Sequence, residues 1–125
     1  MKLRAATRGS PLALWQTNFV SMLLKPLGIE VEPLILKTKG DQDQVTPLHV
    51  IGGRGIFVKE IQQAVLNGTA HFAVHSLKDL PPLPVNGLSL AAVTKRGDPR
   101  DALVGKNLNN LPHGANVATG SIRRK

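Results

Sequence analysis

Chemistry-bearing side chains are densest at His75–Asp79, a short run that holds a histidine, a serine, a lysine and an aspartate. The run ends an apolar segment that predicts a buried strand over 72–75. In open α/β sheets, ligands bind beyond the carboxyl ends of the strands. Asp79 beside Lys78 can form an acid–base pair there, and its carboxylate can stabilise a developing positive charge. The alternative is a solvated turn before Pro81, and these residues alone favour neither interpretation.

A second candidate is Arg8–Gly9–Ser10, which joins a predicted strand over 3–7 to a predicted helix that starts at Pro11. Serine is a good helix cap, and proline suits the first helical position. Free amide groups and the helix dipole favour an anion there, and Arg8 can add a bidentate contact. The alternative is a capped helix with a surface arginine.

A third candidate closes the sequence, where Thr119 and Ser121 precede Arg123 and Arg124. Hydroxyls, backbone amides and paired arginines form a plausible cradle for a carboxylate or a phosphate. The alternative is a solvated, frayed basic chain end.

Two other patterns are weaker indications of a functional site. The glycine-bearing segment 51–55 lacks the ending of a phosphate-binding loop and the spacing of a dinucleotide fingerprint, so we expect a flexible loop. His71 and His75 are four positions apart, but they flank a predicted strand and have no third ligand. We therefore expect no metal site.

The elements that position these candidates predict an α/β fold. The helix from Pro11 should end before Pro26, with Gly28 nearby, and a strand should follow over 29–36. A strand, a helix and a second strand form a right-handed crossover with parallel strands. The remaining expectations are a long loop over 38–54, a helix over 55–66 capped by Asn67 and Gly68, an irregular stretch over 77–85 and a strand over 88–93.

The end of the sequence differs from the rest. Residues 95–100 are charged and include Gly97 and Pro99, which is typical of a hinge. The tail beyond them has only short apolar runs, and units below roughly 40 residues rarely fold unaided. The tail therefore has the character of a second domain that is cut off partway.

Composition narrows the function classes. The 125 residues include no cysteine, which excludes a disulfide scaffold and a catalytic thiol. No apolar run reaches the roughly 18 residues of a membrane span, so we expect a cytoplasmic protein with no membrane partner. The formal net charge of +8 attracts anions. Because the basic residues are scattered and lack interleaved aromatics, we expect no nucleic-acid partner.

Taken together, six ordered segments resemble the porphobilinogen deaminases, also called hydroxymethylbilane synthases. The resemblance covers essentially the whole chain, and the order of the six segments makes it specific. The segments are Arg4–Gln16, Thr38–Asp41, Gly52–Glu60, Ala73–Pro81, Arg96–Ala102 and Thr119–Arg124.

The resemblance implies an enzyme that condenses four porphobilinogen molecules into hydroxymethylbilane, with release of ammonia, on a dipyrromethane cofactor. It implies a type II periplasmic-binding-protein-like domain 1, with a mixed sheet and flanking helices, over residues 1–94. A hinge over 95–100 and a truncated start of domain 2 over 101–125 would follow. The active site would lie in the cleft between the two domains, beneath a mobile loop over 38–54.

Site residues follow from the resemblance position by position. Asp79 matches the catalytic aspartate, whose carboxylate stabilises positive charge on a pyrrole nitrogen. Arg8 and Ser10 match residues that hold substrate carboxylates. The residues that match the holders of the cofactor's acetate and propionate groups are Ser76, Lys78, Thr119, Ser121, Arg123 and Arg124.

Departures from the family set the remaining expectations. The family attaches its cofactor to a cysteine in domain 3, and this chain has none. Gly120 stands where the family commonly has serine, and Arg54 where it commonly has lysine. We therefore expect the 125 residues alone to be inactive, and their unpaired strand surface makes a dimer plausible although the family is usually monomeric. The alternative function is a non-catalytic anion-binding module of binding-protein type.

Overall fold

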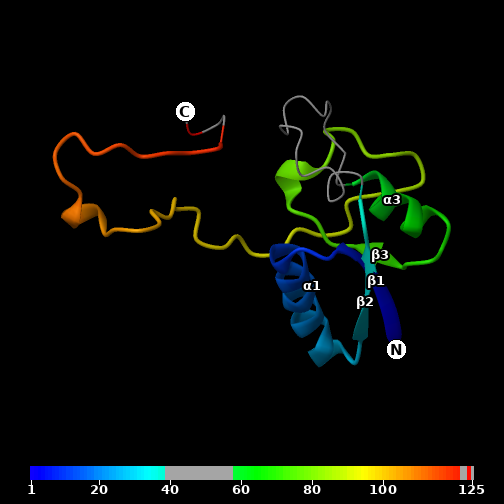
Figure 1. Cartoon of the computed structure of the whole chain (residues 1–125). Coiled ribbons are helices and arrows are strands. Elements are labelled where there is room, and N and C mark those ends of the chain that lie inside the picture. Colours follow the sequence, from blue (N-terminus) through cyan, green and yellow to red (C-terminus); the bar gives the residue numbers. More distant parts are fainter. Residues whose placement is uncertain (39–57, 122–123, 125) are drawn as a thin grey trace. The chain divides into compact units, whose positions relative to one another are not determined.

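The computed structural model describes residues 1–38, 58–121 and 124. The chain separates into two compact units, Met1–Ala91 and Ala92–Lys125. Figure 1 traces both in sequence order. All the regular strands and α-helices that the described residues form belong to the first unit, which is an α/β structure.

A three-stranded parallel sheet organises the first unit, in the order β2-β1-β3. The central strand β1 (Lys2–Arg8) pairs along its whole length with β2 (Glu30–Leu36), while β3 (Phe72–Ala73) pairs with it only at Ala5 and Ala6. The two predicted amino-terminal strands and their parallel pairing are thus confirmed. Because all three strands run in one direction, their carboxyl ends meet at the same edge of the sheet.

Helix α1 (Pro11–Leu24) connects β1 to β2 and has the predicted ends. The Ser10 Oγ accepts a hydrogen bond from the Ala13 amide at 3.3 Å, which caps the first turn. The α-helix stops at Leu24, and a 3₁₀ turn that contains Pro26 follows. Gly28 then adopts the left-handed conformation, with φ at 72°, and turns the chain into β2.

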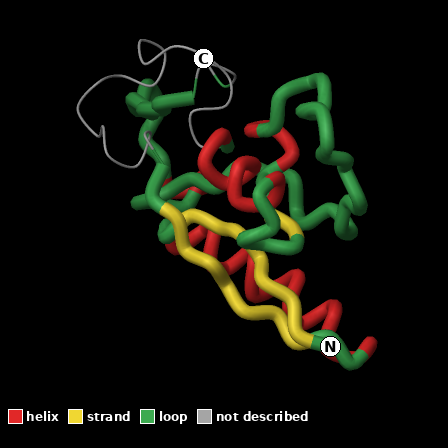
Figure 2. Tube along the Cα trace, turned by 90° about the vertical axis from the view of Figure 1, so that its right-hand side faces the viewer, coloured by secondary structure: helices red, strands yellow, loops and turns green. Residues whose placement is uncertain are grey.

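The two helices of the first unit cover opposite faces of the sheet (Figures 1 and 2). Successive strand residues point to opposite faces. Ala6 therefore packs with Ile61 and Ala64 of α3 (Lys59–Leu66), whereas the Thr7 hydroxyl lies 3.4 Å from the Ala13 carbonyl of α1. Ala6 and Ile61 are fully buried, so this small aliphatic core fixes the end of β1 and hence Arg8.

Three predictions about the later elements need correction. No strand forms over 88–93: Leu90 and Val93 are 56% and 66% exposed, because an extended segment becomes a strand only when a neighbour satisfies its backbone groups. The expected mixed sheet is parallel throughout the described residues. The strand predicted over 72–75 is shortened to β3.

The helix predicted over 55–66 is described only from Lys59, and its predicted cap at Asn67 is confirmed. Residues 39–57, which include most of the predicted loop over 38–54, lie outside the described residues.

The second unit has little regular structure in the part that is described. It contains the 3₁₀ turn Leu108–Asn110, in which the Asn107 side chain accepts from the Asn109 amide at 3.3 Å. Asp98 and Arg100 form an exposed ion pair. Across the described ranges of both units, no helix is long and apolar enough to cross a membrane.

Candidate functional site

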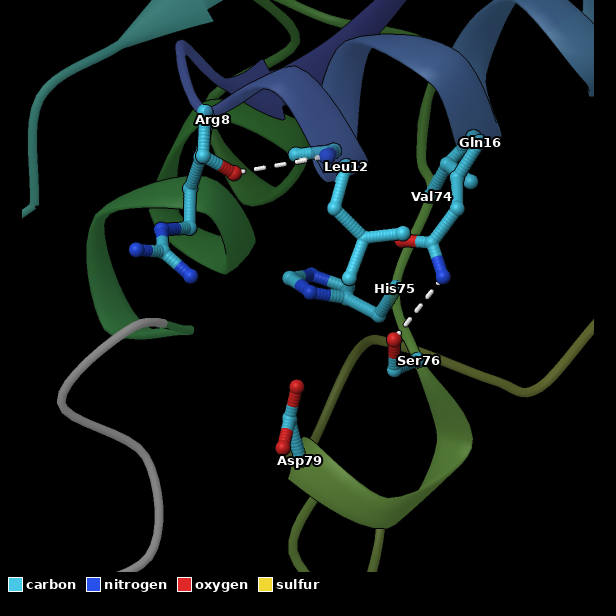
Figure 3. A pocket seen from close by; sticks show the side chains of 9 residues that line it. Arg8, Leu12, Gln16, Val74, His75, Ser76 and Asp79 are labelled. Carbon is cyan, nitrogen blue, oxygen red and sulfur yellow. Dashed lines mark hydrogen bonds between the residues drawn. The ribbon is translucent and has the colours of Figure 1, made fainter. Parts of the chain in front are cut away.

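A cavity of about 50 Å³ opens at the carboxyl ends of β1 and β3 (Figure 3). Its volume admits a few water-sized groups, which suits a carboxylate. The strand β1, the first turns of α1 and the segment after β3 all contribute to its wall. The lining residues are Arg8, Ser10, Leu12, Ala13, Gln16, Val74, His75, Ser76 and Asp79.

The basic side of the pocket comes from the junction of β1 and α1. Arg8 is the last residue of β1, so its position depends on the pairing of that strand with both neighbours. The Ser10 Oγ already accepts from the Ala13 amide as the helix cap. A hydroxyl has one donor hydrogen besides its acceptor lone pairs, so Ser10 retains a donor for a ligand. Arg8 and Ser10 therefore present donor groups suited to an anion.

The acidic side of the pocket is carried by the 3₁₀ turn Leu77–Asp79. The Asp79 amide donates to the Ser76 carbonyl at 2.9 Å, and this bond closes the turn that presents the carboxylate to the cavity. Lys78, on the same turn, is exposed and does not line the cavity. Aspartate and arginine thus line one pocket from separate segments, whereas the neighbouring lysine, which is exposed as Asp79 is, does not line it.

Ser76 is held by a residue of α1. The Gln16 Nε2 donates to the Ser76 Oγ at 2.8 Å, which joins α1 to the segment after β3 (Figure 3). Because the serine oxygen accepts this bond, the hydroxyl hydrogen remains available for a ligand acceptor. Gln16 thereby orients the Ser76 hydroxyl, which is part of the cavity lining.

His75 is the least satisfied group in the pocket. Its Nε2 is buried and has no hydrogen-bond partner among the described residues. Burial lowers the pKa of His75 because the charged imidazolium loses hydration, the Asp79 carboxylate opposes this, and the Arg8 charge adds to the lowering. The net direction is downward, so the imidazole is uncharged at neutral pH.

The remaining predicted residues lie in the second unit. The Ser121 amide donates to the Thr119 Oγ1 at 3.1 Å, and the Arg124 amide donates to the Ser121 carbonyl at 3.1 Å. The Arg124 guanidinium forms an ion pair with Asp101 at 2.6 Å. Arg123, like Arg54 of the glycine-bearing loop, lies outside the described residues.

The structure brings four of the predicted site residues into one cavity: Arg8, Ser10, Ser76 and Asp79. Sequence reasoning missed Gln16 as a member of the pocket. Its position offered a sign, since it follows Leu12 and Ala13 by four and three residues and therefore shares their helix face. The sequence identifies His75 only as part of a polar run, and its spacing from His71 predicts no metal site.

The donor set fits the side chains of a dipyrromethane cofactor better than it fits a metal. Arginine and hydroxyl donors suit acetate and propionate groups. Covalent attachment is a different matter, because none of the 125 residues is a cysteine. Within the described ranges, no group of three or more histidine, aspartate or glutamate residues could hold a metal ion.

A pocket with anion-binding donors at the carboxyl ends of parallel strands defines a ligand-binding α/β unit. The family model described as "Porphobilinogen deaminase, dipyromethane cofactor binding domain" matches residues 3–125. The chain therefore belongs to the porphobilinogen deaminase family.

Curated relatives agree with this assignment. The porphobilinogen deaminase of Campylobacter fetus subsp. fetus is 50% identical over 128 residues, which cover 100% of this chain and 42% of the relative. That of Nitratiruptor sp. is 51% identical over 128 residues, with 100% and 41% coverage. That of Sulfurimonas denitrificans is 49% identical over 129 residues, with 99% and 41% coverage. The chain thus spans about two fifths of the length of these relatives.

Proposed function

We propose that this chain supplies part of the active site of a hydroxymethylbilane synthase. The enzyme condenses four porphobilinogen molecules and releases ammonia, as a transferase of tetrapyrrole and haem biosynthesis. The observation that carries the proposal is the convergence of Asp79 and Arg8 on one cavity at the carboxyl ends of parallel strands. Membership of the porphobilinogen deaminase family supports it.

Each pocket residue has a role that its chemistry permits. Arg8 and Ser10 bind a carboxylate of the substrate and so fix its orientation. The Asp79 carboxylate, which also lines the cavity, stabilises the positive charge that develops on a pyrrole nitrogen. Ser76, oriented by Gln16, donates to an acetate or propionate oxygen.

The cofactor supplies a pyrrole chain to which substrate units are added. Ser76 and Lys78 of the first unit would bind its carboxylates. The resemblance gives Thr119, Ser121, Arg123 and Arg124 the same role, which their hydroxyl and guanidinium donors permit. These residues bind and orient, and the attachment thiol has to come from a segment outside these 125 residues.

The proposal extends to the domain architecture. Residues 1–94 would form most of a type II periplasmic-binding-protein-like domain, 95–100 a hinge, and 101–125 the start of a second domain. The parallel crossover of β1, α1 and β2 is compatible with that fold. The enzyme would act in the cytoplasm, a location that cell fractionation tests.

A non-catalytic anion-binding module is the alternative. It would need the donors of Arg8 and Ser10 but not a carboxylate beside them, because Asp79 repels an anionic ligand. The presence of Asp79 in the lining therefore favours the enzyme.

A chimera tests the proposal. This chain replaces the matching 128-residue segment of the Campylobacter fetus relative, and hydroxymethylbilane formation is measured. We expect activity, and we expect Asp79→Asn to lower it about 100-fold or more, as loss of transition-state electrostatic stabilisation does. Asp98→Asn, an exposed aspartate outside the pocket, is the matched control and should retain activity. A folded chimera that binds porphobilinogen without turnover would support the binding module instead.

The isolated chain provides a complementary test. We expect the 125 residues to show no turnover of porphobilinogen, because they cannot attach the cofactor. Unpaired strand edges pair readily with other chains, so we also expect a dimer. Turnover by the purified chain would contradict the expected inactivity. A strict monomer over a wide concentration range in light scattering would contradict the expected dimer.

A further inference from the structure

Three ionisable side chains line the cavity, and only two of them have a role so far. Arg8 comes from β1, Asp79 from the turn Leu77–Asp79, and His75 from the segment between β3 and that turn. Figure 3 shows His75 among the residues that line the pocket, together with Leu12 of α1. His75 is thus placed where it can meet whatever ligand Arg8 and Asp79 bind.

The His75 Nε2 is a buried polar atom without a hydrogen-bond partner among the described residues. Buried polar groups are nearly always hydrogen-bonded, so such an atom on a side chain that lines a cavity calls for an explanation. The flanking residues are fixed, because the Val74 amide donates to the Ala6 carbonyl at 3.4 Å and Ser76 is held by Gln16 at 2.8 Å. The backbone that carries the imidazole is therefore restrained at the pocket.

We infer that His75 is a further ligand-binding residue, whose Nε2 forms a hydrogen bond with the ligand carboxylate that Arg8 attracts. The inference rests on the proposed function, since it takes the ligand to carry a carboxylate. It adds a contact that neither Arg8 nor Ser10 supplies and gives the buried nitrogen a partner.

Binding should then be coupled to proton uptake. Among the described residues, the charged groups that face His75 are Arg8 from β1 and Asp79 from the 3₁₀ turn, while the cap residue Ser10 and the lining residues of α1 are uncharged. A bound carboxylate offsets the Arg8 charge and favours the imidazolium, so it raises the pKa of His75. Solvent supplies the proton that the imidazole takes up.

The test uses the whole chain and the nitrogen resonances of its histidine rings. Propionate, as a plain carboxylate, and porphobilinogen are titrated separately. We expect the His75 ring resonances to move and saturate with both ligands. His71 and His113 are internal controls, since both are exposed and lie outside the pocket lining, and their signals should stay in place.

Two variants separate the hydrogen bond from the charge. His75→Leu removes the polar atom and should weaken porphobilinogen binding about 10-fold, the usual scale for a bond to a charged group. His75→Gln keeps an amide near the Nε2 position and should retain most of the affinity. It should abolish proton uptake, which calorimetry in two buffers of different ionisation enthalpy measures.

The outcomes are distinct. Unmoved His75 resonances with both ligands would overturn the inference, and this readout needs no variant. If porphobilinogen shifts other pocket signals but not those of His75, the inference fails and the proposed function stands. If propionate moves the His75 signals and porphobilinogen moves no pocket signal at all, His75 binds carboxylates as inferred and the proposed substrate fails.

Discussion

The first unit buries Ile61 completely, whereas the second leaves Val104 92% exposed, although both are aliphatic residues in apolar runs. Ile61 lies on a helix that packs against a sheet. Val104 lies in a segment that has no second layer within the described part of its unit. The difference teaches that apolar content alone does not produce a core, because burial needs a paired element on the other side.

Polar contacts differ between the units in the same way. In the first unit, the Gln16–Ser76 bond joins residues 60 positions apart, and the Arg4 amide donates to the His71 Nδ1 across 67 positions. In the second, the Asn107 and Thr119 side chains accept from amides two positions away, and the exposed ion pair of Arg124 with Asp101 is the longer-range side-chain contact among its described residues. Long-range bonds can assemble a pocket from separate segments, whereas local ones only shape turns.

The largest expected effect is at the core of the first unit. Ile61→Ala should destabilise the chain by about 2–5 kcal/mol, because it removes buried methyl groups and leaves a cavity. Urea unfolding measures the change. Val104→Ala in the second unit is the matched control and should stay within about 0.5 kcal/mol. Equal losses would mean that the second unit has a core too.

A smaller contrast is expected between two glycines. Gly87 has φ at 87°, and a Cβ there would meet the Leu66 side chain at 3.1 Å. Gly87→Ala should cost about 1–2 kcal/mol from backbone strain, with the contact adding to it. Gly105 has φ at 108° with open space around it. Gly105→Ala should leave the unfolding midpoint of the first unit unchanged, and a comparable shift would show that the two units unfold together.

The stability of the first unit should depend on pH in part through the titration of His75. Its pKa is lowered in the folded state from an ordinary value of 6.5, so the unfolded chain binds more protons just below that pH. Stability should therefore fall as the pH drops from about 6.5 toward the lowered folded value. Urea titrations at several pH values should show a weaker fall in this window for His75→Gln. Identical slopes would contradict the expectation.

The smallest effect is expected from the ion pair of Asp98 and Arg100. The Arg100 guanidinium lowers the pKa of Asp98 through hydrogen bonds, but both groups are solvent-exposed. Exposed ion pairs contribute little to stability. Asp98→Asn should leave the thermal midpoint unchanged, and a clear drop would show that this local contact supports a larger structure.

The predictable part of the fold is the part that local patterns specify. The start of α1 follows from Ser10 and Pro11, and its end follows from Pro26 and Gly28. The strand predicted over 88–93 failed because pairing depends on a neighbour elsewhere in the chain. A strand pattern states what a segment can do and not which partner it finds.

The pocket, too, can be predicted from the sequence only where local patterns specify its residues. The sequence alone predicts four of the lining residues, because polar residues at strand ends and helix starts can be identified from the order of residue types. These four are Arg8, Ser10, Ser76 and Asp79. The bond between Gln16 and Ser76 cannot be predicted in this way, because it depends on the packing of α1 beside the segment after β3. Likewise, the unsatisfied state of the His75 Nε2 can be recognised only once its neighbours are placed.

The pairing of β1 with β3 has a kinetic consequence. It joins Arg4 to His71 across 67 positions, and closing a loop of that length costs about 4 kcal/mol in chain entropy. The contact between the two walls of the pocket should therefore form late in folding. A ligand that spans Arg8 and Asp79 binds only after this step, so it should slow unfolding without speeding the refolding of the chain.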